Sequence, residues 1–245
     1  MFFNRQPVVN SRVIALLGMH RSGTSCLTGS LQLKGLFLGD VHEWNQHNLK
    51  GNRENEKIAT LNEDLLAYNG GSWHLPPQTM KWRRVHKKRR NEILKEFVAT
   101  GQPCWGFKDT RVTFTLPFWQ EAVPAIKCVG TFRHPLLVAQ SLNKRDDMPV
   151  DYAINCWCAY NERMLEHYRK QPFPIISFDL DQQEYLAGID RIVKLLELPK
   201  PDGDVFLDKE LKSTQPELAM EHLTDRAKEL YRQLQDAYQE SLKVG

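Results

Sequence analysis

The fold is decided by residues 13–33, which read VIALLGMHRSGTSCLTGSLQL. The first five residues form an apolar run suited to a buried strand, and the last eight continue as a helix. Between them, Gly18 to Ser25 has the spacing Gly-x-x-x-x-Gly-x-Ser, with Thr24 in place of the usual lysine. Backbone N–H groups at such a turn, together with the positive end of the helix dipole, form an anion site. The sequence therefore predicts a phosphate-binding loop, and the missing lysine argues against an ordinary ATPase.

A second anion-binding motif follows the strand expected at residues 126–132. Arg133 comes at the end of this strand, and Pro135 suits the first position of a helix that we expect to continue through Asn143. Ser141 lies in the second turn of that helix. Because the planar guanidinium group of arginine matches the geometry of a phosphate, Arg133 and Ser141 predict a second anion site, separate from the loop.

Together, these motifs resemble those of the sulfotransferases that use 3′-phosphoadenosine 5′-phosphosulfate (PAPS) as donor. In that family the strand-loop-helix unit holds the 5′-phosphosulfate, and an arginine with a serine eight residues later holds the 3′-phosphate. The resemblance covers roughly residues 10–210 and looks like a bacterial branch of small soluble members. It extends to residues 62–66, 70–73, 105–111, 116–119 and 138–142. The donor-binding residues that it implies are Arg21, Ser22, Gly23, Thr24, Ser25, Cys26, Arg133 and Ser141.

The resemblance implies transfer of the sulfuryl group to an acceptor hydroxyl, with adenosine 3′,5′-bisphosphate as the product. No metal is expected, because fixed cations and N–H donors can stabilise a sulfuryl group, which carries fewer negative oxygens than a phosphoryl group. Arg21 and Lys108 are the candidates for this electrostatic role, since family members often place a lysine after the third core strand. The structural alternative for Lys108 is a solvated lysine at a strand end.

The proton acceptor is harder to assign. Many cytosolic relatives use a histidine at the position that Thr110 occupies here, and a threonine cannot serve. Glu54, in the segment GNRE at residues 51–54, resembles the Gly-x-x-Glu segment of branches that use a glutamate, although a Glu in a first helical turn can simply complement the helix dipole. Asp109 is the second candidate, or else a structural carboxylate paired with Lys108 or Arg111.

Strand and helix patterns alternate along the chain, which predicts an α/β, P-loop-type three-layer fold with a central parallel sheet flanked by helices. Further strands are expected at residues 104–107 and 174–178, and further helices at 58–66, 85–97, 150–168 and 185–196. A turn cluster at residues 199–203 precedes a terminal amphipathic helix over about residues 222–243, which we expect to dock on the core rather than form a dimer. We treat residues 1–245 as a single domain with its core at about 10–210.

Composition narrows the functional classes further. The formal net charge is only +3, which predicts no general affinity for nucleic acid. Five cysteines show neither metal-site spacing nor a disulfide framework, and no apolar stretch near the start suits a signal peptide or transmembrane anchor. These features predict a cytoplasmic protein. Seven of the ten residues 81–90 are Lys or Arg, as in a solvated helix face or a surface for an anionic glycan or lipid acceptor.

Three hypotheses follow. The first is a PAPS-dependent sulfotransferase that acts on a hydroxyl of a carbohydrate or glycolipid, with Trp73 available to stack on a sugar or to pack in the core. The second is a P-loop kinase with Ser25 and Asp109 on Mg²⁺, which the missing loop lysine weakens. The third is a nucleotide-binding protein without catalytic activity.

Overall fold

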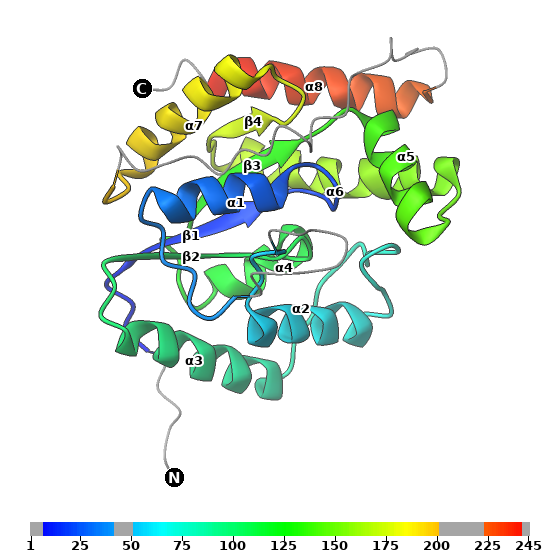
Figure 1. Cartoon of the computed structure of the whole chain (residues 1–245). Helices are drawn as coiled ribbons and strands as arrows, with labels where there is room; N and C mark the ends of the chain where they lie inside the picture. The colour runs from blue at the N-terminus through cyan, green and yellow to red at the C-terminus, as the bar shows by residue number, and fades with distance from the viewer. Residues whose placement is uncertain (1–6, 42–50, 201–222, 242–245) are drawn as a thin grey trace.

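The computed structural model describes residues 7–41, 51–200 and 223–241. In this part of the chain, four strands form one parallel sheet in the order β2-β1-β3-β4 (Figure 1). The strands are β1 (Arg12–Leu17), β2 (Cys104–Lys108), β3 (Lys127–Phe132) and β4 (Ile175–Ser177). The helices are α1 (Thr24–Leu33), α2 (Glu56–Tyr68), α3 (Arg84–Ala99), α4 (Val112–Gln120), α5 (Pro135–Asp146), α6 (Val150–Lys170), α7 (Gln182–Leu196) and α8 (Asp225–Ser241).

The sheet is buried on both faces, and strand β1 shows how the sequence achieves this. Successive side chains of a strand point to opposite faces. Val13, Ala15 and Leu17 therefore enter one hydrophobic cluster, while Ile14 and Leu16 enter another. Because both faces of the sheet are covered, each position of residues 13–17 must be apolar, which is the pattern typical of a strand inside a parallel sheet.

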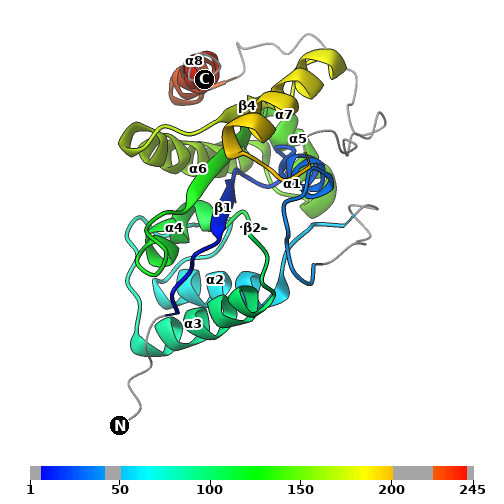
Figure 2. The same ribbon diagram turned by 90° about the vertical axis from the view of Figure 1, so that its left-hand side faces the viewer.

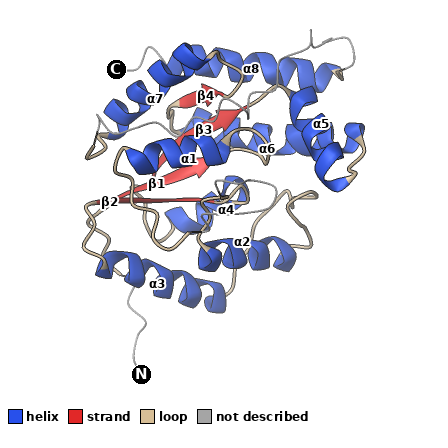
Figure 3. Ribbon diagram, in the orientation of Figure 1, coloured by secondary structure: helices blue, strands red, loops and turns tan. Residues whose placement is uncertain are grey.

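The two hydrophobic clusters define the helical layers. The larger cluster receives side chains from α2 to α6 and from α8, and the smaller one from α1 and α7. In Figure 2, α4 and α6 lie on one side of β1, while α1 and α7 lie on the other. Figure 3 shows the strands enclosed between these helices, with α2 and α3 along the β2 edge. The predicted α/β fold with a central parallel sheet flanked by helices is confirmed.

Helix α4 is the element that the sequence analysis missed. Pro117 lies inside it and cannot donate a hydrogen bond to the carbonyl oxygen of Thr113, four residues earlier. The Nε2 atom of His167, on α6, lies 2.9 Å from this oxygen and takes the place of the missing donor. The helix therefore persists through its proline because a distant side chain completes its hydrogen bonding.

Helix α8 docks on the core, as predicted, over its described residues. Its contacts are with α6 and β4. The predicted apolar stripe is buried throughout and consists of Leu223, Ala227, Leu230, Leu234, Ala237 and Ser241. Most of the turn expected at residues 199–203 lies outside the described residues.

Helix α6 is a core helix of 21 residues. Its Cys156 and Cys158 are buried, and so are the other three cysteines, all of which lie in the described part of the chain and are free thiols. Burial raises the pKa of Cys156 and of Cys128 to about 12, so these thiols stay protonated and pack as small apolar groups. Among the described helices, none combines the length and the apolar character needed to cross a membrane.

Candidate active site

The predicted phosphate loop connects the end of β1 to the start of α1. Gly23 precedes the helix with a φ of 82°, and a Cβ atom placed on it would lie 2.3 Å from Cδ2 of Phe178. Glycine is therefore required both by the backbone conformation and by the neighbouring ring. No side chain caps the N-terminus of α1, so its first N–H groups are available to an anion.

Ser22 carries an unusual polar atom within this loop. Its side chain is fully buried, and its Oγ has no hydrogen-bond partner among the residues that the structure describes. Its carbonyl oxygen, in contrast, accepts a hydrogen bond of 3.0 Å from Oγ1 of Thr131. A buried hydroxyl without a partner is costly, so the Ser22 hydroxyl is a polar group of the loop that a bound water or anion would satisfy.

Arg21 connects the loop to the second predicted motif. Its Nε donates a hydrogen bond of 2.7 Å to Oγ of Ser141, on α5, although 120 positions separate the two residues. The backbone of Arg21 has a φ of 66°, a conformation that is uncommon for non-glycine residues and that recurs at active sites. The structure thus brings the two predicted anion-binding motifs into direct contact.

Arg133 lies beside this contact, at the end of β3. It is 9% exposed, and its guanidinium group stands 5.4 Å from the ring centre of Phe178, the residue that packs on Gly23. Burial, and then the charges of Arg145 and Arg133, lowers the pKa of Arg21. These guanidinium groups repel one another across a shared space, and an anion bound there would relieve the repulsion.

Lys108 and Glu54 form a second centre at the end of β2. The Nζ atom of Lys108 lies 2.7 Å from Oε1 of Glu54 and 3.0 Å from the carbonyl oxygen of Asn52. Their side chains are only 4% and 14% exposed, so Lys108 is not a solvated surface lysine. Helix α2 begins after its N-cap, Asn55, so Glu54 precedes the first helical turn. The ion pair with Lys108, and not a place in the first turn of α2, accounts for the position of the Glu54 side chain.

The contacts of Asp109 are those of an interior carboxylate. It is fully buried, and its Oδ2 accepts a hydrogen bond of 2.8 Å from Nδ2 of Asn62. Its Oδ1 accepts from the backbone N–H and the Nη1 of Arg111, at 3.2 and 2.7 Å. Burial, followed by the charge of Glu54, raises the pKa of Asp109 to about 6, although Arg111 acts in the opposite direction. Asp109 therefore holds Arg111 and Asn62 in place beneath the site.

His20 and Thr110 join the loop to the end of β2. The Nε2 atom of His20 lies 2.7 Å from Oγ1 of Thr110. Burial, and then the charge of Lys108, lowers the pKa of His20 well below its ordinary value, so the imidazole is neutral near pH 7. The ring meets the edge of Trp73, at 4.7 Å between ring centres, and Arg145 stands 5.8 Å from the centre of the indole. A half-buried aromatic side chain is thus present beside the candidate catalytic centre.

Four of the seven cations in the basic run at residues 81–90 have an acidic partner within the molecule. Lys87 and Arg90 both pair with Glu121, at 2.6 and 2.9 Å. Arg89 pairs with Asp64, and Lys88 lies 3.9 Å from Glu92. These contacts favour a salt-bridged face of α3 over a surface for an anionic acceptor.

Asp179 is the site residue that the sequence analysis missed. It lies two residues beyond the end of β4, after Phe178, and its carboxylate contacts Arg133. A charged residue at the end of the strand expected at 174–178 was the available signal, because the carboxyl ends of parallel strands meet at one edge.

Among the described residues, no group of three or more His, Cys, Asp or Glu side chains is placed to hold a metal ion.

Comparisons with known proteins agree with this architecture. No protein-family model matches the sequence, and no curated protein matches it. Among solved structures, the chain is similar to a sulfotransferase domain from the Synechococcus PCC 7002 olefin synthase, with a TM-score of 0.52. The two are 16% identical, and the similarity covers 92% of this chain and 82% of the other. The chain has a sulfotransferase-like fold.

Proposed function

We propose that this chain is a PAPS-dependent sulfotransferase that moves a sulfuryl group to an acceptor hydroxyl. The observation that carries the proposal is the 2.7 Å hydrogen bond between Arg21 and Ser141, with Arg133 beside it. Two motifs predicted to bind oxyanions, from distant parts of the sequence, lie together at the carboxyl edge of one parallel sheet. Such an edge is where ligands of open α/β sheets bind. A donor with phosphates at both ends of one nucleoside would engage both motifs.

The residues of the site fit this donor. The uncapped start of α1 and the unpartnered hydroxyl of Ser22 suit the 5′-phosphosulfate, and Ser25 and Cys26 belong to the first turn of that helix. Arg133 and Ser141 suit the 3′-phosphate. Thr24, which is 5% exposed, stands where kinases of this loop type carry a lysine, so the loop lacks the lysine that contacts the β- and γ-phosphates in those kinases.

PAPS, when bound, supplies the sulfuryl group and leaves as adenosine 3′,5′-bisphosphate. Lys108 and Arg21 stabilise the negative charge that develops on the oxygen between phosphorus and sulfur. The carboxylate of Glu54 takes the proton of the acceptor hydroxyl. We assign this step to Glu54 rather than to Asp109, because Glu54 is partly exposed beside Lys108 and Asp109 is fully buried.

The acceptor side of the site is bounded by His20 and Trp73. The neutral imidazole provides a hydrogen-bonding group beside Lys108, and the indole provides an apolar surface of the kind that packs against sugar rings. These side chains support a hydroxyl-bearing carbohydrate or glycolipid as the acceptor class.

Thermal-shift titration with adenosine 3′,5′-bisphosphate, AMP and ATP, each with and without Mg²⁺, tests the proposal. We expect the bisphosphate to stabilise the protein without metal and more strongly than AMP, and Arg133→Ala to remove most of this preference. Lys170→Ala, at the end of α6, is the matched control that removes an exposed cation from another surface.

The other outcomes are equally specific. Stabilisation that requires Mg²⁺ and ATP would replace the proposal with a phosphotransferase. Bisphosphate binding without release of bisphosphate from PAPS, over a panel of glycan acceptors, would identify a nucleotide-binding protein without catalysis.

A further inference from the structure

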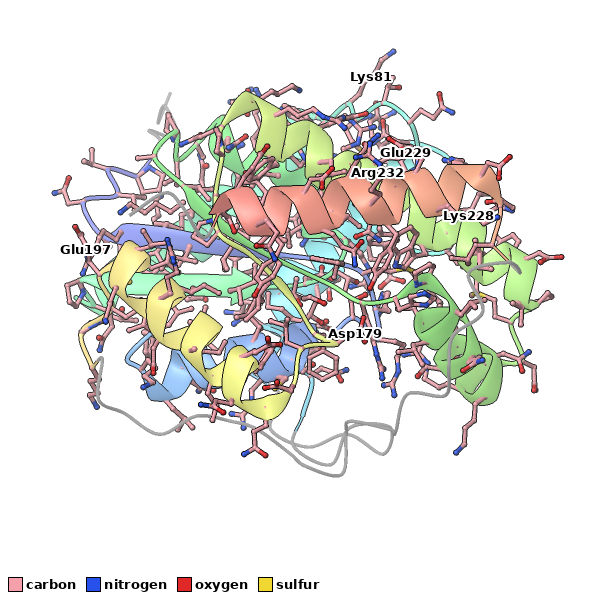
Figure 4. The ribbon with its side chains drawn as sticks, turned by 90° about the horizontal axis from the view of Figure 1, so that it is seen from above. Lys81, Asp179, Glu197, Lys228, Glu229 and Arg232 are labelled. Atoms are coloured by element: carbon pink, nitrogen blue, oxygen red, sulfur yellow. The ribbon has the colours of Figure 1, made fainter. Side chains whose placement is uncertain are left out.

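The carboxylate of Asp179 contacts Arg133 of the candidate 3′-phosphate site and the first residues of the helix that carries Ser141. Strands β3 and β4 pair in parallel with Phe132 opposite Ser177, and the N–H of Phe178 donates to the carbonyl oxygen of Phe132 at 2.8 Å. The residues that follow the two strands are therefore neighbours at the carboxyl edge. In Figure 4, viewed from above, Asp179 lies between α7 and α5, well inside the outline of the molecule.

The two carboxylate oxygens of Asp179 contact different groups. Oδ1 lies 3.3 Å from Nε of Arg133, and Oδ2 accepts a hydrogen bond of 2.6 Å from the backbone N–H of His134. The side chains of Arg133 and Asp179 are only about a tenth exposed, at 10% and 11%. An ion pair screened from water in this way holds its geometry better than a surface pair does.

The second contact matters because His134 is the N-cap of α5, the helix that carries Ser141 two turns later. One carboxylate thus fixes the guanidinium group of Arg133 and the start of the helix that positions Ser141. Its negative charge also suits the N-terminus of this helix.

Aromatic side chains pack around Arg133 and His134. Nε1 of Trp157 donates a hydrogen bond of 3.0 Å to the carbonyl oxygen of Arg133. Tyr231, from α8, packs its ring 4.9 Å from His134, and burial together with the Asp179 charge raises the pKa of this tyrosine to about 12. The charge on Asp179 is therefore enclosed by packed groups and not by open solvent.

We propose that Asp179 is a positioning residue that sets the selectivity of the site for a 3′-phosphorylated nucleotide. It does so by orienting Arg133 and anchoring the helix of Ser141. This inference rests on the proposed function and deepens it. A carboxylate beside a phosphate site reduces the electrostatic attraction of that site for any anion. The presence of Asp179 is therefore explained by its orienting of Arg133 and not by its own charge.

The test compares dissociation constants for adenosine 3′,5′-bisphosphate and AMP by calorimetry in the wild type, Asp179→Ala and Asp179→Asn. We expect Asp179→Ala to lower the preference for the bisphosphate about tenfold or more, as for loss of a hydrogen bond to a charged group, with little change for AMP. Asn offers one acceptor oxygen for two N–H groups. The preference of Asp179→Asn for the bisphosphate should therefore lie between that of the wild type and that of Asp179→Ala. Asp181→Asn is the control, because Asp181 caps α7 through the N–H of Glu184, 2.8 Å away, on the same loop.

The possible results separate the two proposals. A wild type that prefers the bisphosphate, with the preference unchanged or increased in both Asp179 variants, would overturn the role of Asp179 and leave the proposed function standing. Equal loss of both ligands would indicate general damage to the fold and would also overturn a role in selectivity. A wild type with no preference for the bisphosphate would overturn both proposals.

Discussion

The Glu54–Lys108 pair combines a proton acceptor and a cation at one point of the sheet edge. Because Glu54 is expected to act only in the reaction, Glu54→Gln should lower the rate of bisphosphate release from PAPS by about 10²–10⁴-fold. The amide keeps an oxygen for Lys108, so binding of adenosine 3′,5′-bisphosphate should change little. Initial rates and calorimetry separate the two effects. Glu56→Gln, in the first turn of α2, is the control, and equal rates for the two variants would remove Glu54 from the mechanism.

Asp109 gives the protein a pH dependence that can be measured without a substrate. Burial raises its pKa to about 6, so the native state retains a proton that the unfolded chain loses near pH 4. Between these values the unfolded state binds fewer protons, and the free energy of unfolding contributed by Asp109 falls as the pH rises. Relative to the wild type, Asp109→Asn should therefore gain stability from pH 4 to pH 7, by on the order of 2–3 kcal/mol. Urea denaturation across this range measures the difference, and a constant difference would contradict the assignment.

At the scale of elements, the loop before α1 depends on Gly23. In Gly23→Ala the new Cβ would meet the ring of Phe178 as well as an unfavourable φ of 82°. We expect a loss of more than 2 kcal/mol of unfolding free energy and loss of bisphosphate binding. Gly70→Ala is a matched control, because Gly70 has a similar φ of 73° and no atom within 4 Å of an added Cβ. If the two variants lose equal stability, the ring contact is not the cause.

Elements with local signals were predictable from the sequence, and contacts between distant segments were not. The apolar run at 13–17 and the glycines of the loop predicted β1, the turn and α1, because each signal lies within a few residues. Helix α4 was missed because Pro117 is a local helix breaker, whereas the group that compensates for it lies on α6. For the same reason Arg21 and Arg133 could be named as anion-binding residues, but the partner of Arg21 and the role of Asp179 required the folded structure.

His167 supplies the test of this compensation. In His167→Leu, the carbonyl oxygen of Thr113 loses its partner, and we expect a loss of about 1–3 kcal/mol at pH 7.5. His167→Gln, which can still donate, should lose less. Burial lowers the pKa of His167 in the folded state, so as the pH falls the unfolded chain binds a proton at this residue before the native state does. The contribution of His167 to wild-type stability therefore falls as the pH drops below about 6.5. Urea denaturation should show this acid-side loss in the wild type and a smaller one in the Gln variant.

At the scale of the whole molecule, the cations at the carboxyl edge of the sheet differ from those on α3. Arg21 and Arg133 lie close enough beside the loop for their charges to repel, with Asp179 as an acidic partner of Arg133, whereas Lys87 and Arg90 on α3 both pair with Glu121. Figure 1 places α5 beyond the carboxyl ends of the strands and α3 along the far edge of β2. A nucleotide with two phosphates should therefore bind at the strand ends and leave α3 unaffected.

Hydrogen exchange with and without adenosine 3′,5′-bisphosphate tests this division. Binding to the native state alone stabilises it by about 2.7 kcal/mol at one hundred times the dissociation constant. We expect the added protection to be greatest at residues 18–26 and 133–141, because the ligand would bridge these segments directly. Helix α3 should show only the slowing common to all amides that exchange through global unfolding. Protection centred on residues 84–99 would instead place the anion on the basic helix, and the strand-end site would then have to be abandoned.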